Sequence, residues 1–216
     1  MLRLGLPSRD GEPLRILCLG AHSDDIEIGC GGTLLFLKSA SALPRFHWVV
    51  FSATGRRGKE AEKAARLFTE GCDQTVDLKG FRDGFLPYHG AEVKEFFEDL
   101  KAQVNPDLIF THWRGDAHQD HRLISELTWN TFRDHLILEY EIPKYDGDMG
   151  RPNFFVPLEG PLHTRKVEFL IQAFESQRAK HWFREDTFLS LMRLRGMECN
   201  APGGYAEAFY SHKLVL

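Results

Sequence analysis

The chain has 216 residues, of which 43% are hydrophobic, 27% charged and 12% aromatic, and its formal net charge is −4. This size and composition predict one globular domain whose core is large enough to need no covalent cross-links. The weak negative charge excludes a chain-wide basic surface for nucleic acid or anionic lipid, and it is too small to indicate disorder.

Short apolar runs alternate with helix-like stretches in the first two thirds of the chain. We expect strands over 15–21, 46–53, 74–78 and 107–111, and helices over 33–40, 60–70 and 91–104. In "AEVKEFFEDLKAQV" (91–104) the apolar residues recur with the 3.6-residue period of a helix, and Asn105-Pro106 ends it. This alternation predicts an α/β fold, with a mainly parallel sheet and flanking helices.

The pattern changes from about residue 137. "ILEYEIPKY" and "NFFVPLEG" predict short strands around a Gly/Pro-rich loop at 146–152, and helices are expected over 161–174 and 180–194. Since no repeat, low-complexity segment or linker divides the chain, we expect residues 1–216 to form a single domain.

The cysteines are Cys18, Cys30, Cys72 and Cys199, and no two of them form a C-x-x-C pair. We therefore expect free thiols, buried where the surroundings are apolar. The N-terminal "MLRLGLPSRDGEP" lacks the apolar core of a signal peptide, and no apolar run approaches the roughly 18 residues that cross a bilayer. These features favour a reducing, cytoplasmic location without a membrane span.

The first candidate site follows the first expected strand. "AHSDDIEIGCGGTL" (21–34) contains His22, Asp24 and Asp25 ahead of a glycine-rich run. Either aspartate can simply cap the next helix. The glycines, in turn, fit a tight turn or a loop that cradles a phosphate, and a glycine run alone is weak evidence for either.

The second candidate site follows the fourth expected strand. "THWRGDAHQDHRLISELTW" (111–129) contains His118, Asp120 and His121, and the spacing of three puts both imidazoles on one side of a helix. Either histidine alone is more simply an exposed helix-start residue. Because carboxyl ends of parallel strands share one sheet edge, the two segments should meet there.

Together the segments offer a ligand set typical of catalytic zinc. Two histidines and one carboxylate hold the metal while a fourth position stays open for water. A remaining carboxylate can then accept a proton, and a remaining imidazole can stabilise an oxyanion.

These residues resemble the LmbE-like/PIG-L zinc-dependent de-N-acetylases. The first segment matches the family's A-H-P-D-D motif and its G-G-T-L. Weaker matches are "RGKEAEKAA" (57–65), "LKGFRDGFL" (78–86), Ser176-Gln177 and "YAEAF" (205–209). The family's second motif, H-x-x-x-D-x-H-x-D-H, is met by His112, Asp116, His118, Asp120 and His121.

The resemblance implies a Rossmann-like fold and one Zn²⁺ per chain. It assigns the zinc ligands to His22, Asp25 and His121 and the general base to Asp24. It further implies that His118 stabilises the tetrahedral intermediate and that Asp120 orients His118. The implied substrates are small molecules carrying N-acetylglucosamine on an inositol, malate, lipid or other aglycone, and the part from about residue 137 would elaborate the substrate side.

Two departures from the family pattern concern the entrance to the site. Ser23 replaces the usual proline, and the stretch between Gly55 and Arg57 is shorter than usual. Arg57 and Asp83 follow the second and third strands, so we expect both to bind substrate; a solvated surface arginine and an Asp-Gly turn are the alternatives.

Two other functions fit parts of the sequence. A related zinc amidase acting on a larger amide conjugate would keep all of these residues. A non-catalytic sugar- or nucleotide-binding module would explain the glycines but not the His-x-Asp-His cluster. The sequence predicts no nucleic-acid partner, and it leaves open whether the chain forms a homo-oligomer.

Overall fold

The computed structural model describes residues 5, 12–39 and 43–215, which build one seven-stranded sheet. The strand order is β3-β2-β1-β4-β5-β7-β6, and β1 to β5 are parallel, whereas β7 runs antiparallel to both of its neighbours. The strands are β1 (Arg15–His22), β2 (Arg45–Ser52), β3 (Asp73–Leu78), β4 (Leu108–His112), β5 (Leu136–Tyr140), β6 (Phe154–Pro157) and β7 (Ala206–Tyr210). The predicted mainly parallel α/β fold is confirmed.

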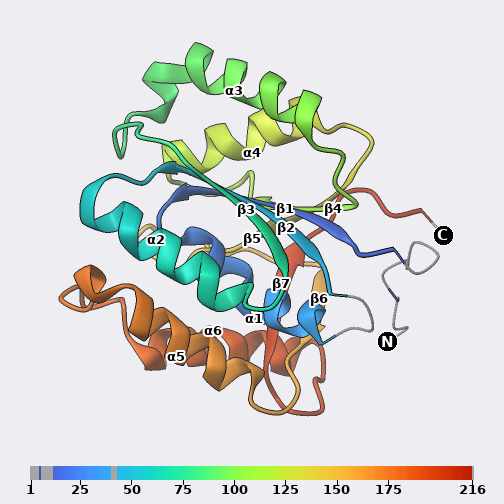
Figure 1. Ribbon diagram of the computed structural model, residues 1–216. Coiled ribbons are helices and arrows are strands. Elements are labelled where there is room, and N and C mark those ends of the chain that lie inside the picture. Colours follow the sequence, from blue (N-terminus) through green and yellow to red (C-terminus); the bar gives the residue numbers. More distant parts are fainter. Residues whose placement is uncertain (1–4, 6–11, 40–42, 216) are drawn as a thin grey trace.

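Helices cover both faces of this sheet (Figure 1). One face carries α3 (Gly90–Gln103) and α4 (Gln119–Thr131), and the other carries α1 (Asp25–Lys38) and α2 (Gly55–Phe68). Beyond α1 and α2 lie α5 (Leu162–Ala173) and α6 (Glu185–Glu198), and the short 3₁₀ turns η1 (Leu86–His89) and η2 (Glu175–Gln177) complete the fold. The C-terminal third therefore thickens one face of the sheet and extends its β5 edge.

Alternating side chains of the strands supply two separate cores. On β1, Ile16 and Cys18 pack toward α1 and α2, whereas Leu17 and Leu19 pack toward α3 and α4. This period of two is what a strand buried on both faces requires. Helices therefore cover both faces of the sheet, and polar groups concentrate at its carboxyl edge.

The glycine run of the first motif is not a turn or a phosphate loop, because α1 begins at Asp25 and contains it. The predicted start at residue 33 was eight residues too late. Side chains at these glycines would overlap the ring of Tyr140 at Gly29, the ring of Phe68 at Gly31 and Leu158 at Gly32. Close packing from three directions outweighs the low helix propensity of glycine.

Other element boundaries also differ from expectation. Helix α2 begins at Gly55 rather than at 60, so that Arg57 lies in its first turn, and α6 spans 185–198 rather than 180–194. Strand β7 was not predicted as a strand; it inserts between β5 and β6. The predicted helix end at residue 40, and residues 1–4 and 6–11 of the N-terminal segment, lie outside the described residues.

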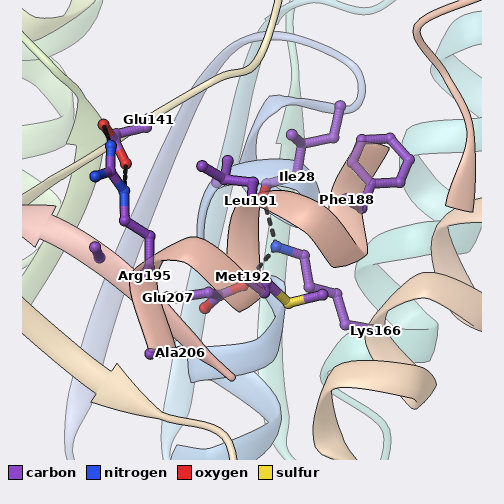
Figure 2. A pocket seen from close by; sticks show the side chains of 11 residues that line it. Ile28, Glu141, Lys166, Phe188, Leu191, Met192, Arg195, Ala206 and Glu207 are labelled. Carbon is purple, nitrogen blue, oxygen red and sulfur yellow. Dashed lines mark hydrogen bonds and ion pairs between the residues drawn. The ribbon is translucent and has the colours of Figure 1, made fainter. Parts of the chain in front are cut away.

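Two buried ion pairs join the C-terminal part to α1 and β5 (Figure 2). Lys166 Nζ lies 2.6 Å from Glu207 Oε1 and donates to the Ile28 carbonyl, also at 2.6 Å. Arg195 makes two hydrogen bonds to Glu141, at 2.6 and 2.9 Å. The cavity between the pairs measures about 20 Å³, which is enough for one water and far too small for a sugar.

Among the described residues, no helix combines the length and apolar content that crossing a bilayer requires.

Candidate metal centre

The segments that follow the five parallel strands meet at one edge of the sheet. Strand β1 pairs with β2 on one side and with β4 on the other, so consecutive crossovers leave this point in opposite directions. Such a switch point opens a crevice at the carboxyl ends of the strands. Both candidate segments lie here, because the first follows β1 and the second follows β4.

Three potential ligand atoms form a compact triangle at this edge of the sheet. His22 Nδ1 lies 3.1 Å from His121 Nε2 and 3.3 Å from Asp25 Oδ2. The third side, from His121 Nε2 to Asp25 Oδ2, is 3.5 Å. The structure therefore brings together the three residues expected as ligands.

The size of the triangle fits a tetrahedral metal site. Zinc bonds to nitrogen and oxygen of about 2.0–2.1 Å give ligand–ligand separations of about 3.3 Å in a tetrahedron. If no cation lay between them, two imidazole nitrogens and one carboxylate oxygen this close together would have few protons with which to form hydrogen bonds to one another. Both the donor types and their spacing therefore suit a divalent metal ion.

The opposite nitrogen of each histidine contacts a carboxylate. His121 Nδ1 lies 2.9 Å from Asp116 Oδ2, and His22 Nε2 lies 3.1 Å from Asp120 Oδ2. Asp83, whose side chain is 77% exposed, also approaches His22 Nε2 at 3.2 Å. A carboxylate that accepts the outer N–H fixes the tautomer and directs the inner lone pair toward a metal.

The structure shows that Asp120 contacts His118 through its backbone, whereas its carboxylate contacts other groups. That carboxylate contacts His22 and accepts the backbone N–H groups of Gly84, at 2.8 Å, and Leu86, at 3.1 Å. Asp120 meets His118 through its own backbone N–H, which donates to His118 Nδ1 at 3.2 Å. The sequence could not reveal this, because Gly84 and Leu86 belong to the segment after β3.

Asp24 occupies the N-cap position of α1 but makes no side-chain capping bond. Its Oδ1 instead accepts from Arg57 Nη2 at 2.6 Å, while its Oδ2 is buried without a hydrogen-bond partner among the described residues. Arg57 Nη1 is likewise buried and unpartnered among them. Asp24, the residue before the candidate ligand Asp25, thus has one unengaged oxygen, and the helix-cap alternative does not account for its side chain.

His118 is the N-cap of α4 and lies beside the triangle, with its ring centroid 4.8 Å from that of His22 and 4.6 Å from that of His121. Because its Nδ1 accepts the backbone N–H of Asp120, a neutral ring carries its proton on Nε2. Burial and the neighbouring His121 lower the pKa of His118. His118 can therefore act as a neutral hydrogen-bond donor.

Charges in the metal-free centre balance one another. Burial opposes a charge on Asp25, but His121 and His22 outweigh it and hold the pKa of Asp25 well below its usual value. Burial likewise opposes a proton on His22, but Asp25 and Asp120 raise the pKa of His22 well above its usual value. The carboxylates around His22 thus favour a positive charge at this position.

Sequence reasoning gave no role to several neighbours. His112 stacks on His121 with ring centroids 3.9 Å apart, and its Nε2 accepts the Ala21 N–H at 2.9 Å, so its lone pair is engaged. Glu27 is fully buried and has no hydrogen-bond partner on any other described residue; burial raises its pKa well above the usual value. Glu27 comes two residues after the segment that matches A-H-P-D-D, and this position was the available signal.

Lys144 was also missed. It follows β5 and lies 2.8 Å from the Asp116 carboxylate that contacts His121. No local motif marks it, because its partner is 28 residues away. Burial would raise the pKa of Asp116, but His121 and Lys144 lower it strongly.

Ser23, which replaces the usual proline, is fully buried, and its hydroxyl lies 3.4 Å from the Ser52 carbonyl at the end of β2. The serine thus links the segment after β1 to the end of β2.

The comparisons with known proteins agree with this geometry. The family described as PIG-L, GlcNAc-PI de-N-acetylase, matches residues 17–132. The uncharacterized deacetylase YaiS of Escherichia coli K12 is 31% identical over 142 residues, which are 59% of this chain and 74% of YaiS.

Solved structures share the fold over most of the chain. The conserved protein TT1542 of Thermus thermophilus is 24% identical with a TM-score of 0.72, covering 94% of this chain and 96% of its own. The N,N'-diacetylchitobiose deacetylase of Pyrococcus horikoshii is 21% identical with a TM-score of 0.68, covering 92% and 83%. The Pseudomonas putida hydratase GalB has a TM-score of 0.71 at 17% identity, covering 94% and 98%, so the fold alone does not fix the reaction.

The family match extends from β1 through α4 and so includes both segments of the centre. This chain belongs to the PIG-L (LmbE-like) family of de-N-acetylases, which are hydrolytic enzymes.

Proposed function

We propose that this chain is a zinc-dependent hydrolase that removes the N-acetyl group, or another short acyl group, from an amino sugar or its conjugate. The observation that carries the proposal is the ligand triangle of His22, Asp25 and His121, with sides of 3.1–3.5 Å, together with a buried and unengaged oxygen on the adjacent residue Asp24. A purely structural metal site would leave no such free base.

His22 Nδ1, Asp25 Oδ2 and His121 Nε2 would hold the metal. When bound, zinc acidifies a water molecule and polarises the amide carbonyl. Zinc is favoured by two imidazoles and one carboxylate, although the same donors also suit iron or cobalt.

Asp24 serves as the general base. Its Oδ2 is free to accept the proton of the attacking water, while Arg57 fixes the carboxylate through Oδ1 at 2.6 Å. His118 donates its Nε2–H to the oxygen of the tetrahedral intermediate, because its Nδ1 is engaged by a backbone N–H.

Hydrolysis then balances simply. The water oxygen bonds to the acyl carbon, the carbon–nitrogen bond breaks, and the proton taken by the base is returned to the leaving nitrogen. Asp24 delivers that proton directly, or His118 gives its Nε2 proton to the nitrogen and regains the one held by Asp24; the products are the carboxylic acid and the amine, which ionise to carboxylate and ammonium in water.

Arg57 and Asp83 are proposed to contact the sugar. Arg57 Nη1 is buried without a partner among the described residues, and the Asp83 side chain is mostly exposed at the rim of the crevice. Both can pair with ring hydroxyls, which a site must do to discriminate one sugar from another. The segment between β5 and β6 follows a strand of the same edge, which supports its assignment to the substrate side.

The four cysteines are free, which fits action in a reducing compartment such as the cytoplasm.

The test is a deacetylation screen with the released amine as readout, over N-acetylated sugars, glycosides, sugar nucleotides and larger amide conjugates. Zinc content is measured on the same preparation. Asp24→Asn is the matched control, because it keeps the shape of the side chain but removes the base; it should retain zinc and lose about 100-fold or more in turnover.

Three results would contradict the proposal: full activity of metal-free protein, activity of Asp24→Asn equal to wild type, or a protein that binds sugars without metal and hydrolyses none of them. The last would support the non-catalytic binding module. Activity only on the larger conjugates would point to the related amidase.

A further inference from the structure

A lysine outside both motifs lies directly behind the candidate metal centre. Lys144 is in the segment after β5, and its side chain is 12% exposed. Its ammonium contacts Asp116 Oδ2 at 2.8 Å and Asp148 Oδ2 at 2.5 Å. Among the described residues, two permanently charged side chains contact a carboxylate of this centre. Arg57 contacts Asp24, and Lys144 contacts Asp116.

The oxygen that Lys144 contacts is the one that holds His121. Asp116 Oδ2 lies 2.9 Å from His121 Nδ1, and Asp116 Oδ1 accepts the backbone N–H of His118 at 2.7 Å. Lys144 is thus the third donor to this carboxylate and approaches it from the segment after β5. Three donors from different directions leave a carboxylate little freedom to rotate.

We propose that Lys144 is a positioning residue of the metal centre: it fixes the Asp116 carboxylate, and through it the ring of the metal ligand His121. The inference rests on the proposed metal site. It differs from a merely structural role, in which Lys144 would only tie the segment after β5 to the loop before α4.

A substitution at the neighbouring Asp148 distinguishes between these two roles of Lys144. Its Oδ2 accepts both the Lys144 ammonium and the backbone N–H of Ala117, so it is the loop-tying partner. Asp148→Asn keeps an acceptor for the backbone but weakens the loop tie, and it leaves Lys144 on Asp116. Lys144→Gln keeps most of the side-chain length but removes the ammonium from both partners.

The experiment measures Zn²⁺ affinity and the rate of Zn²⁺ release to a chromophoric chelator, for wild type, Lys144→Gln, Lys144→Arg and Asp148→Asn. Thermal unfolding of each metal-free protein is recorded alongside. Loss of an outer partner of a metal-binding histidine typically weakens metal binding 10- to 100-fold. We expect Lys144→Gln to bind Zn²⁺ about 10-fold more weakly and to release it faster.

In the same experiment Lys144→Arg should recover most of the affinity, and Asp148→Asn should stay within about twofold of wild type. The absorption spectrum of the Co²⁺-substituted protein should change in Lys144→Gln, because it reports the ligand arrangement directly. If Lys144→Gln does not fold, the Zn²⁺ affinities of the folded Lys144→Arg and Asp148→Asn proteins are compared instead. The inference then requires that Asp148→Asn bind Zn²⁺ at least as tightly as Lys144→Arg.

The inference is overturned if Lys144→Gln binds Zn²⁺ as tightly as wild type or more tightly, or if Asp148→Asn loses as much affinity as Lys144→Gln. Wild-type protein that binds no divalent metal would instead overturn the proposed function, so the two failures are distinct.

Discussion

The buried pair of Lys166 and Glu207 gives a stability prediction whose size follows from the structure. Lys166 is 2% exposed and Glu207 is 4% exposed, and their charged atoms lie 2.6 Å apart. The Glu207 carboxylate also accepts the backbone N–H groups of Gly32, at 2.8 Å, and Thr33, at 2.6 Å. The Lys166–Glu207 pair therefore forms hydrogen bonds with the backbone of α1, the helix that begins with Asp25 (Figure 2).

Lys166→Met removes the positive charge but fills similar space. It leaves the Glu207 carboxylate buried with neutral donors only, and it takes a donor from the Ile28 carbonyl. Removing one partner of a buried ion pair costs about 3–5 kcal/mol. In a chain of this size, each kcal/mol lowers the melting temperature by about 2–4 °C, so we expect a drop of about 6–20 °C.

The assay is urea unfolding of the metal-free protein followed by tryptophan fluorescence, with a thermal scan beside it. Lys63→Met is a matched control, because Lys63 also donates to a helix carbonyl, that of Gln172 at 2.8 Å, but in an exposed position. It should change stability by no more than about 0.5 kcal/mol. The double variant Lys166→Met/Glu207→Gln should recover much of the loss, because no unpaired charge remains buried.

A loss below about 1 kcal/mol in Lys166→Met, or an equal loss in Lys63→Met, would refute this reasoning, since the expected cost of an unpaired buried charge is several times larger. The first outcome would mean that water reaches Glu207, and the second that any lysine on this side of the fold matters equally.

Further predictions concern the centre itself. Asp25→Asn should weaken Zn²⁺ binding more than about 100-fold, beyond the loss typical of an outer partner, and zinc retained after dialysis at the wild-type level would contradict this. His118→Ala should keep its zinc and lose about 100-fold in kcat; an unchanged kcat would remove His118 from the transition state. The pKa of His22 is raised, so at neutral pH a proton competes for its Nδ1. Zn²⁺ affinity should therefore rise with pH between about 6 and 8, by up to about tenfold per unit, and an affinity independent of pH would show that His22 is already neutral.

The sequence was sufficient to predict the architecture and the meeting of the candidate ligand residues, because both depend on short-range patterns. Apolar strands alternate with amphipathic helices, and each candidate ligand lies at the end of a strand or within nine residues after it. Parallel pairing then brings His22, Asp25 and His121 to one edge, although 99 residues separate His22 from His121. The rule that parallel strands end at the same edge of a sheet is thus enough to predict that two motifs far apart in the sequence meet in the fold.

Only the tertiary structure decided which groups these side chains contact. The start of α1 depends on Tyr140, Phe68 and Leu158, which exclude side chains at three helical positions. The partners of the Asp120 carboxylate and the contact of Lys144 were missed, because both depend on segments that follow other strands. Propensity and spacing act over a few residues, whereas the partner of a buried polar group is set by whichever chain segment packs against it.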